Sequence, residues 1–480
     1  MRVRRLGELS GTQDAERFEQ AIAHARSMPE LFADDAPLLA ARAPGRLDVM
    51  GGIADYSGSL VLQLPLAVAT TAVIQATAEP TIEVVSRRGT ESSRFAMPVD
   101  ALVRGELRDP AALAAFFAAR ERDRWAAYVI GVAHACLVAR GAGDAPDAGG
   151  FRLLVESTVP EGKGVSSSAA LEVACLSVIS ARYGLDMTGE EIATASQWAE
   201  NHVAGAPCGI MDQMTSACGR RDRLLRLRCQ PGTVEGHVDV PQGYRFYGID
   251  SGIRHAVTGA DYGTVRTAAF MGYRIIADVA GLPSSIDAAN VRELDTRWRG
   301  YLANVTPAEL ESRFLAHLPE RMTGAEFLSR YDGITDTVTR VQAGREYPLR
   351  QATAHPIHEN ARVTRFAELL GGLRAGATEI AREMGALMYA SHASYGACGL
   401  GSEGTDRLVE LVRGAGPESG MFGAKITGGG SGGTVAVLAS VDAEASVRDI
   451  ARRYSAETGR DAEVFAGSGM GAEVVGVVAA

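Results

Sequence analysis

Residues 159–174 read VPEGKGVSSSAALEVA, a glycine-containing turn that leads into three serines and an alanine-rich helix. Glycine residues allow the backbone to fold closely around a bulky anion. The first amides of an α-helix have no partner within the helix, and the helix dipole adds partial positive charge at that end. The pattern therefore predicts a phosphate-binding loop, although a serine-capped helix after a turn has the same local sequence.

Three further segments carry residue types that suit chemistry. Residues 41–58 read ARAPGRLDVMGGIADYSG, residues 205–216 read GAPCGIMDQMTS, and residues 422–434 read FGAKITGGGSGGT. Taken singly, they also fit a surface arginine after a turn, an aspartate at a helix N-cap and a glycine-rich turn. The last segment matches the dinucleotide fingerprint G-x-G-x-x-G, but a strand and not a helix is predicted to follow it, so a dehydrogenase is excluded.

Composition and charge limit the function classes. The 480 residues are enough for two domains, and the net charge of −10 argues against a nucleic-acid partner. No apolar run is long enough for a membrane span, and the basic N-terminus has no apolar stretch behind it, so we expect no membrane partner and no secretory signal. The six cysteines are scattered and the nine histidines lack ligand spacing, which favours a cytoplasmic protein without disulfides or structural zinc.

Alternating helical and strand-like patterns predict a layered α/β fold. A T-x-x-E capping box at Thr188 and Glu191 predicts a helix that continues to about Val203. The other expected helices cover 13–28, 112–121, 125–140, 167–183, 261–280, 359–391, 403–413 and 442–457. The expected strands lie near 60–77, 81–87, 151–157, 222–229, 244–250, 434–440 and 462–467. The character of the chain changes around 245–260, and the polar segment 284–356 suggests no role.

The four segments together, in this order and at these distances, resemble the GHMP small-molecule kinases, a family named for galactokinase, homoserine kinase, mevalonate kinase and phosphomevalonate kinase. Residues 205–216 resemble the galactokinase-like sugar kinases in particular. The resemblance implies an α/β (α+β) two-domain fold with the active site between the domains. The N-terminal domain, over 1–250, would be like ribosomal protein S5 domain 2, with residues 1–40 as a helical extension. The C-terminal domain, over 251–480, would be ferredoxin-like.

The resemblance also implies ATP and a monosaccharide as substrates and Mg²⁺ as cofactor, and it leaves open whether the protein is a monomer or a dimer. Phosphoryl transfer needs a held triphosphate, neutralised charge and an activated hydroxyl. The resemblance assigns the catalytic base to Asp212, its partner to Arg46 and the Mg²⁺ ligands to Ser168 and Glu200. It assigns support of the phosphate loop to Gly428, Gly429 and Gly430. The ATP-binding residues would be Pro160, Gly162, Lys163, Gly164, Val165, Ser166, Ser167, Ser168 and Ala169.

Lys163 departs from the pattern of the galactokinases, which usually have a small residue at this position. A phosphate contact and an exposed loop lysine are both open interpretations of it.

The residues implied in sugar binding are Asp55, Gly52, Ile53, Tyr56, Gly209 and Tyr262. Where galactokinases carry G-E-H-T-D-Y, with the Glu–His pair near the sugar C6 hydroxyl, this chain has GGIADY at 51–56. Gly52 and Ile53 are therefore predicted to leave a void and an apolar wall, which disfavour a polar substituent. Restoring Glu and His there is expected to shift the preference toward galactose.

L-Arabinopyranose is D-galactose without the C6 hydroxymethyl group, so the substitution favours an L-arabinose 1-kinase. A galactokinase with altered specificity and a non-catalytic sugar sensor are the alternatives. The complete serine loop disfavours the sensor, and the lack of an added basic residue in 41–58 disfavours a uronic-acid kinase.

Overall fold

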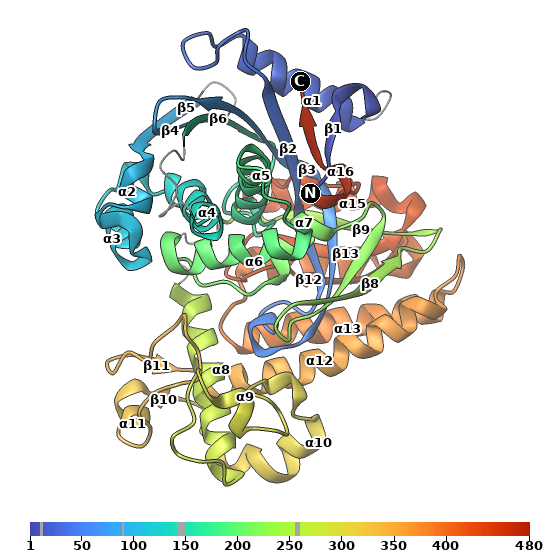
Figure 1. The fold of residues 1–480 in the computed structure, drawn as a ribbon. Helices are drawn as coiled ribbons and strands as arrows, with labels where there is room; N and C mark the ends of the chain where they lie inside the picture. Colours follow the sequence, from blue (N-terminus) through green and yellow to red (C-terminus); the bar gives the residue numbers. More distant parts are fainter. Residues whose placement is uncertain (10–12, 89–90, 142–148, 255–259) are drawn as a thin grey trace.

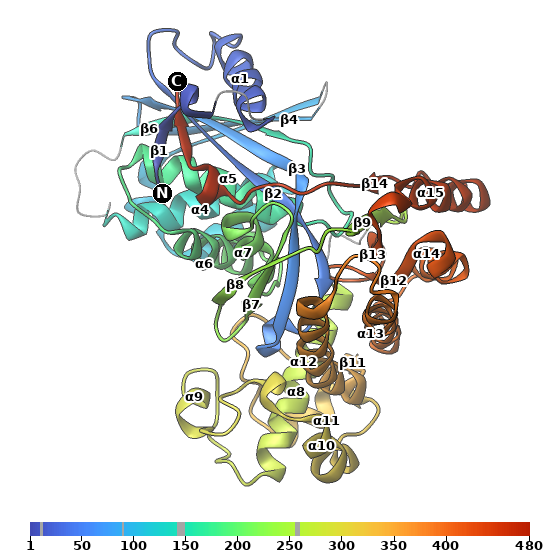
Figure 2. The same ribbon diagram turned by 90° about the vertical axis from the view of Figure 1, so that its right-hand side faces the viewer.

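The computed structural model describes residues 1–9, 13–88, 91–141, 149–254 and 260–480. Figure 1 and Figure 2 show a large sheet with its helices in the upper half of the molecule. A smaller sheet lies beside its lower end with helices α13, α14 and α15, and helices α8 to α11 form the bottom of both views. The expected strands at 60–77, 81–87, 151–157 and 244–250 are confirmed as β3, β4, β6 and β9, within one residue at each end.

The large sheet is built around two long antiparallel strands, β2 and β3. Along the described chain its order is β1-β15-β2-β3-β6-β4-β5, and β7 also pairs with β3 and carries β8. Nearly every position of β2 and β3 is buried, because elements pack on both faces of these strands. The strands are β1 (Val3–Arg5), β2 (Leu38–Met50), β3 (Leu60–Thr77), β4 (Thr81–Arg88), β5 (Glu91–Pro98), β6 (Gly150–Ser157), β7 (Arg223–Arg228), β8 (Thr233–Asp239) and β15 (Val477–Ala479).

Helices cover both faces of this sheet. Helices α4 to α7 share one hydrophobic cluster with the sheet, whereas α1 packs on residues of β2, β3 and β6 that belong to a separate cluster. The predicted capping box at Thr188 and Glu191 is present and starts α6. The helices are α1 (Gln13–Arg26), α2 (Val99–Val103), α3 (Pro110–Ala118), α4 (Ala126–Ala139), α5 (Ser167–Arg182), α6 (Gly189–Ala199), α7 (Met211–Cys218) and α16 (Ala472–Val475).

The smaller sheet is antiparallel and has the order β12-β13-β9-β14. Together with its helices, this order gives the βαββαβ arrangement of a ferredoxin-like domain, as expected. Helices α14 and α15 form a hydrophobic cluster with its strands. The elements are β9 (Tyr244–Asp250), β12 (Met421–Ile426), β13 (Thr434–Ser440), β14 (Val464–Phe465), α13 (Thr378–Ala397), α14 (Glu403–Ala415) and α15 (Glu444–Thr458).

A helical region follows β9 and contains the segment 284–356, whose sequence suggested no role. Its hydrophobic cluster joins α8, α12 and this segment. The single helix predicted over 359–391 is wrong: α12 ends at Gly372, α13 starts at Thr378, and Gly376 between them has a left-handed φ of +79°. The region consists of α8 (Ala260–Val279), α9 (Val291–Leu294), α10 (Pro307–Glu309), α11 (Gly324–Leu328), α12 (Leu349–Gly372), β10 (Met322–Thr323) and β11 (Glu346–Tyr347).

The two ends of the chain meet in the large sheet, where β1 pairs with β15 and β15 pairs with β2. The expected helical extension over 1–40 thus also contains a strand. The expected division at 250/251 falls at the end of β9, whose partners β13 and β14 are both in the smaller sheet. We propose that the division lies before Tyr244 and that the C-terminal strand returns to the first domain.

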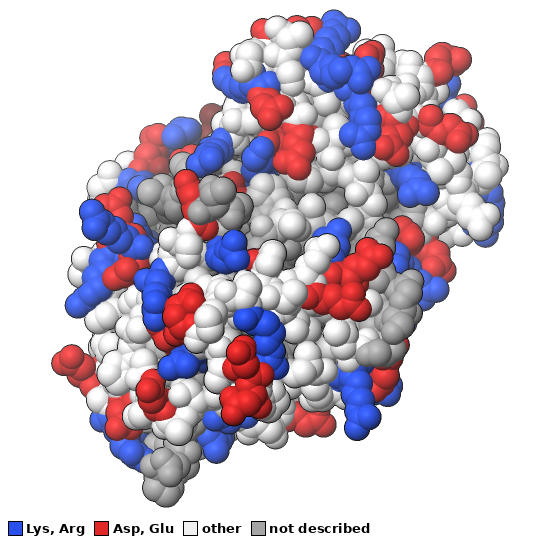
Figure 3. Space-filling view, turned by 90° about the horizontal axis from the view of Figure 1, so that it is seen from above, with Lys and Arg blue, Asp and Glu red and all other residues white. Residues whose placement is uncertain are grey.

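Acidic and basic side chains are interspersed over the face drawn in Figure 3. Within the described ranges, no helix combines the length and apolar character needed to cross a membrane.

A buried ion pair connects the two domains. Asp48 near the end of β2 accepts a hydrogen bond from Lys425 of β12 at 2.6 Å, and both side chains are 0% exposed. The amide of Gln63 donates to the other carboxylate oxygen at 2.7 Å, and the hydroxyl of Thr427 accepts from the Asp48 backbone N–H at 2.8 Å. These bonds offset the cost of removing both charges from water, so the pair tolerates the loss of neither partner.

We expect Lys425→Met to lower the free energy of unfolding by about 3–5 kcal/mol, because it leaves the Asp48 carboxylate buried without its cation. Urea denaturation measures the change. The control is Arg448→Met, which removes an exposed pair with Glu444 and should cost less than about 1 kcal/mol. Adding Asp48→Asn to Lys425→Met should recover part of the loss; equal costs for Lys425→Met and Arg448→Met would contradict the expectation.

Candidate active site

The predicted phosphate loop lies between β6 and α5. Gly162, Gly164 and Ser166 have left-handed φ angles of +69°, +69° and +61°, a conformation natural for glycine and uncommon for serine. These residues turn the chain into α5, which begins at Ser167. Ser167 and Ser168 in its first turn are half-buried, and the first-turn amides have no partner within the helix. The loop therefore offers the donors and the helix dipole that a phosphate group needs.

The remaining loop residues serve the shape of the turn. Val165 and Ala169 are buried, Pro160 is half-buried, and the Val165 carbonyl accepts a hydrogen bond from the Arg46 backbone N–H at 3.0 Å.

The glycine-rich turn after β12 packs directly against this loop. A side-chain carbon at Gly428 would lie 2.9 Å from the Gly164 carbonyl, and the hydroxyl of Thr434 donates to the Lys163 carbonyl at 2.8 Å. Gly430 packs instead against Leu400, and Gly429 lies between the two. The proposal that this turn supports the phosphate loop therefore rests on the close packing of its first glycine, Gly428, against that loop.

Lys163 forms an ion pair, which differs from both interpretations of its sequence position, a phosphate contact and an exposed loop lysine. Its ammonium group donates to Asp250 at the end of β9, and the Asp250 side chain is fully buried whereas that of Lys163 is 23% exposed. Burial raises the pKa of Asp250, against the opposing effect of the Lys163 charge. The pair ties the phosphate loop to the smaller sheet, and no local sequence signal pointed to Asp250.

Arg46 and Asp212 are in direct contact, as the proposed roles require. The Arg46 guanidinium donates from Nε to Asp212 Oδ1 at 2.8 Å and from Nη1 to the Gly164 carbonyl at 2.8 Å. Arg46 is 2% exposed, and the Asp212 side chain, in the first turn of α7, is 22% exposed. Burial opposes the charged form, but Asp212 and Asp48 together raise the pKa of Arg46. One side chain thus joins the proposed base to the phosphate loop.

Asp55 and Gly209 lie against each other beside Asp212. A side-chain carbon at Gly209 would lie 1.7 Å from Asp55 Oδ2, so only glycine allows this approach. Asp55 is 4% exposed, and its Oδ1 has no hydrogen-bond partner among the described residues. Burial and then the negative charge of Asp212 raise the pKa of Asp55 to about 6. A ligand hydroxyl would supply the missing partner.

Tyr56 and Tyr262 form an edge-to-face pair with ring centroids 5.7 Å apart. Beneath them Arg266 of α8 pairs with Asp336 at 2.8 Å and donates to the Cys208 carbonyl at 2.8 Å. Asp336 comes from the segment 284–356, which therefore helps to place the loop that carries Gly209 and Asp212.

The proposed metal ligands meet in a buried acidic cluster. α6 ends at Ala199 and continues as one wider, π-helical turn that contains Glu200, a distortion frequent at functional sites. Glu200 is 6% exposed. Burial is the largest effect and raises the pKa of Glu200 to about 7, the neighbouring Ser168 side chain acts to lower this pKa, and the charge of Asp212 acts to raise it. A hydroxyl and a carboxylate placed together suit Mg²⁺, which prefers oxygen ligands.

Two members of this cluster, Gln213 and Glu172, were not predicted from the sequence. Gln213 donates from Nε2 to Glu200 at 2.6 Å and to Glu172 at 3.2 Å. Glu172 is 0% exposed, and burial and the charge of Glu200 raise its pKa well above the usual range. Its spacing of four residues from Ser168 in one helix was the available signal.

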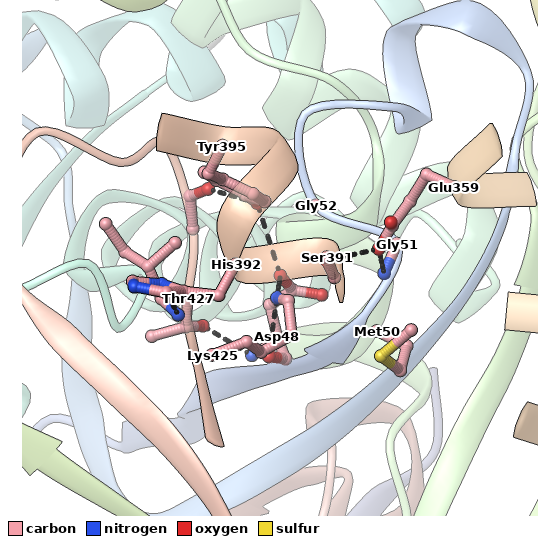
Figure 4. A network of polar contacts seen from close by, with 12 residues as sticks. Asp48, Met50, Gly51, Gly52, Glu359, Ser391, His392, Tyr395, Lys425 and Thr427 are labelled. Atoms are coloured by element: carbon pink, nitrogen blue, oxygen red, sulfur yellow. Dashed lines mark hydrogen bonds and ion pairs between the residues drawn. The ribbon is translucent and has the colours of Figure 1, made fainter. Parts of the chain in front are cut away.

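The void predicted at Gly52 is wrong. A side-chain carbon at Gly52 would lie 1.8 Å from the hydroxyl of Tyr395 and 2.3 Å from Asp48 Oδ2, so two polar groups fill the space (Figure 4). Ile53 is fully buried with a left-handed φ of +48°. The physical reason is that α13, which is distant in the sequence, places Tyr395 where a side chain at position 52 would lie.

Comparisons with known proteins agree with this geometry. Residues 127–220 match the model of the GHMP kinases N terminal domain, and residues 377–457 match that of the GHMP kinases C terminal. The chain is 40% identical to an L-arabinokinase of Arabidopsis thaliana over 98% of its own length and spans 50% of that relative. It is 29% identical to a galactokinase of Chloroflexus aurantiacus, over 90% of this chain and 92% of the relative.

Among solved structures, the galactokinase of Lactococcus lactis complexed with galactose superposes with a TM-score of 0.68 at 21% identity, covering 95% of this chain and 99% of that one. That likeness establishes the two-domain fold. Both domain models match in order, so the chain contains the N-terminal and C-terminal domains of the GHMP kinases.

Proposed function

We propose that this chain is an ATP- and Mg²⁺-dependent sugar 1-kinase. The observation that carries the proposal is the bridge that Arg46 makes between Asp212 and the phosphate-loop carbonyl of Gly164. Asp212 accepts the proton of the anomeric hydroxyl as the sugar oxygen bonds to the γ-phosphorus, and the bond from that phosphorus to the β-phosphate oxygen breaks to release ADP. Arg46 stabilises the negative charge of the transition state. Mg²⁺ held by Ser168 and Glu200 would neutralise phosphate charge.

We propose L-arabinose as the sugar. The similarity to an L-arabinokinase supports it, and so does the blocked space at Gly52, which leaves no room for the glutamate that galactokinases carry there. D-Galactose is the second candidate, because the galactokinases match this chain over nine-tenths of its length. The six cysteines are unpaired and five are buried, which supports the proposed cytoplasmic location.

ATP consumption with L-arabinose, D-galactose, D-glucuronate and D-fucose, measured side by side, tests the proposal. Turnover with L-arabinose as the preferred sugar supports it. Sugar and ATP binding without turnover would favour the sensor instead.

Asp212→Asn should nearly abolish turnover while ATP binding persists, because an amide does not accept the proton from the sugar hydroxyl. Steady-state kinetics and nucleotide binding by calorimetry measure both effects. Asp449→Asn, at an exposed position of α15, serves as control and should leave the rate unchanged. Activity of Asp212→Asn within about threefold of wild type would remove the residue from the role of base.

Ser168→Ala and Glu200→Gln should each weaken the Mg²⁺ dependence of ATP use. Since both would contact one ion, the double variant should lose less than the sum of the two single losses. Titration of the initial rate with Mg²⁺ gives the three values, with Glu190→Gln on the exposed face of α6 as control. Strictly additive losses would argue against a shared ion.

The unmodified enzyme should prefer L-arabinose over D-galactose by about tenfold or more in kcat/KM, because Tyr395 and Asp48 fill the space at Gly52 and leave less room for an added hydroxymethyl group. Sugar-dependent ADP release measures the ratio. Equal values for the two sugars would reject L-arabinose and keep the kinase. The exchange of Gly52 for Glu and Ile53 for His, expected from sequence to favour galactose, should instead disrupt the site, since Tyr395 and Asp48 occupy the required space.

A further inference from the structure

The segment Gly51–Asp55, between β2 and β3, is held by the second domain. Ile53 and Tyr56 belong to the hydrophobic cluster of α8, α12, α13 and the segment 284–356, and not to the core of the large sheet. The same segment presents Asp55 to Gly209 and Asp212. The second domain therefore controls where the first domain's Asp55 lies.

Two side chains of α12 fix the backbone of this segment. Glu359 accepts a hydrogen bond from the Gly51 N–H at 3.1 Å, and His355 contacts the Gly52 carbonyl through Nε2 at 3.0 Å. Burial lowers the pKa of His355 to about 4, so the ring is neutral at pH 7. Because a carbonyl only accepts, Nε2 carries the proton, and Nδ1 accepts from the Ser394 hydroxyl at 2.8 Å.

Tyr395 of α13 provides the third contact and joins it to the phosphate loop. Its hydroxyl is buried, donates to the Gly428 carbonyl at 2.9 Å and lies 3.5 Å from Asp48 Oδ2 (Figure 4). Gly428 is the glycine that packs on Gly164, and the same hydroxyl lies over the Cα of Gly52. The Tyr395 hydroxyl oxygen thus contacts both the segment Gly51–Asp55 and Gly428, the glycine that packs on the phosphate loop.

We propose that Tyr395 is a specificity-determining residue that acts by positioning the segment Gly51–Asp55. Its hydroxyl takes the place of a side chain at position 52, so residues 52 and 395 form a coupled pair. The inference rests on the proposed function, because it assumes that this segment contacts the sugar.

Tyr395→Phe provides the first test. It should raise KM for L-arabinose by about tenfold, because loss of the hydroxyl loosens the segment Gly51–Asp55. KM for ATP should stay within about twofold, because the phosphate loop retains its backbone N–H donors. It should also change the ratio of kcat/KM between L-arabinose and D-galactose by at least about threefold.

Tyr273→Phe is the matched control. Tyr273 lies in the same cluster, is 0% exposed, and loses an equally buried hydrogen bond to Asp295. A merely structural role predicts that both variants lower the thermal midpoint and that neither alters sugar KM. An unchanged sugar KM or an unchanged sugar ratio in Tyr395→Phe would overturn the inference.

A double-variant cycle tests the coupling. Gly52→Ala should lower kcat/KM for L-arabinose by at least about a hundredfold, because its side-chain carbon would overlap the hydroxyl. In the Tyr395→Phe background the same alanine should cost at least about tenfold less, although contact with Asp48 remains. Gly396→Ala on the exposed side of α13, where nothing lies within 4 Å, is the control and should be neutral.

An identical cost of Gly52→Ala in both backgrounds would overturn the pairing. Should Gly52→Ala fail to fold, the Tyr395→Phe kinetics still decide the inference. Absence of ATP turnover with every sugar in the unmodified enzyme would reject the proposed function, a result distinct from both.

Discussion

The guanidinium of Arg46 is buried between an anion and a carbonyl, and the arrangement of the site depends on it. A buried cation is costly without partners, and this one has Asp212 on one side and Gly164 on the other. Its position follows from β2, whose register with β3 shifts between Pro44 and Arg46 and again between Asp48 and Met50. Such irregularities redirect side chains near active sites. They allow neighbouring residues of one strand to serve the phosphate loop and the domain interface.

Several buried acidic groups lie near Asp212, and they are more numerous than the single charge of Arg46 neutralises. Glu200, Asp55 and Glu172 are all nearly or fully buried, and burial raises the pKa of each. A cluster of this kind favours protons or added cations over free charge. Phosphoryl transfer brings further negative charge, so the cluster suits a site that takes up a divalent cation with its nucleotide.

Parts of the molecule with local signals could be predicted from the sequence. The turn and first residues of α5, the capping box of α6 and the alternating strands follow from patterns within a few residues. Contacts between distant segments could not be predicted. Asp250 carries no mark that it meets Lys163, and nothing near Gly52 indicates that the side chain of residue 395 fills its space. The break between α12 and α13 was also missed, because two amphipathic helices in succession have the same period as one.

Three of the missed contacts cross between the domains. Lys163 meets Asp250, Asp48 meets Lys425, and Gly52 meets Tyr395, each time with one partner from each side. The proposed sugar-binding residues of the first domain alone therefore do not determine which sugar fits the site. The glycine at position 52 suggests free space, but in the folded chain Tyr395 of the second domain occupies that space. Substrate choice in such a site depends on pairs of residues. A larger side chain at position 52 is tolerated only where the facing residue of α13 leaves space for it.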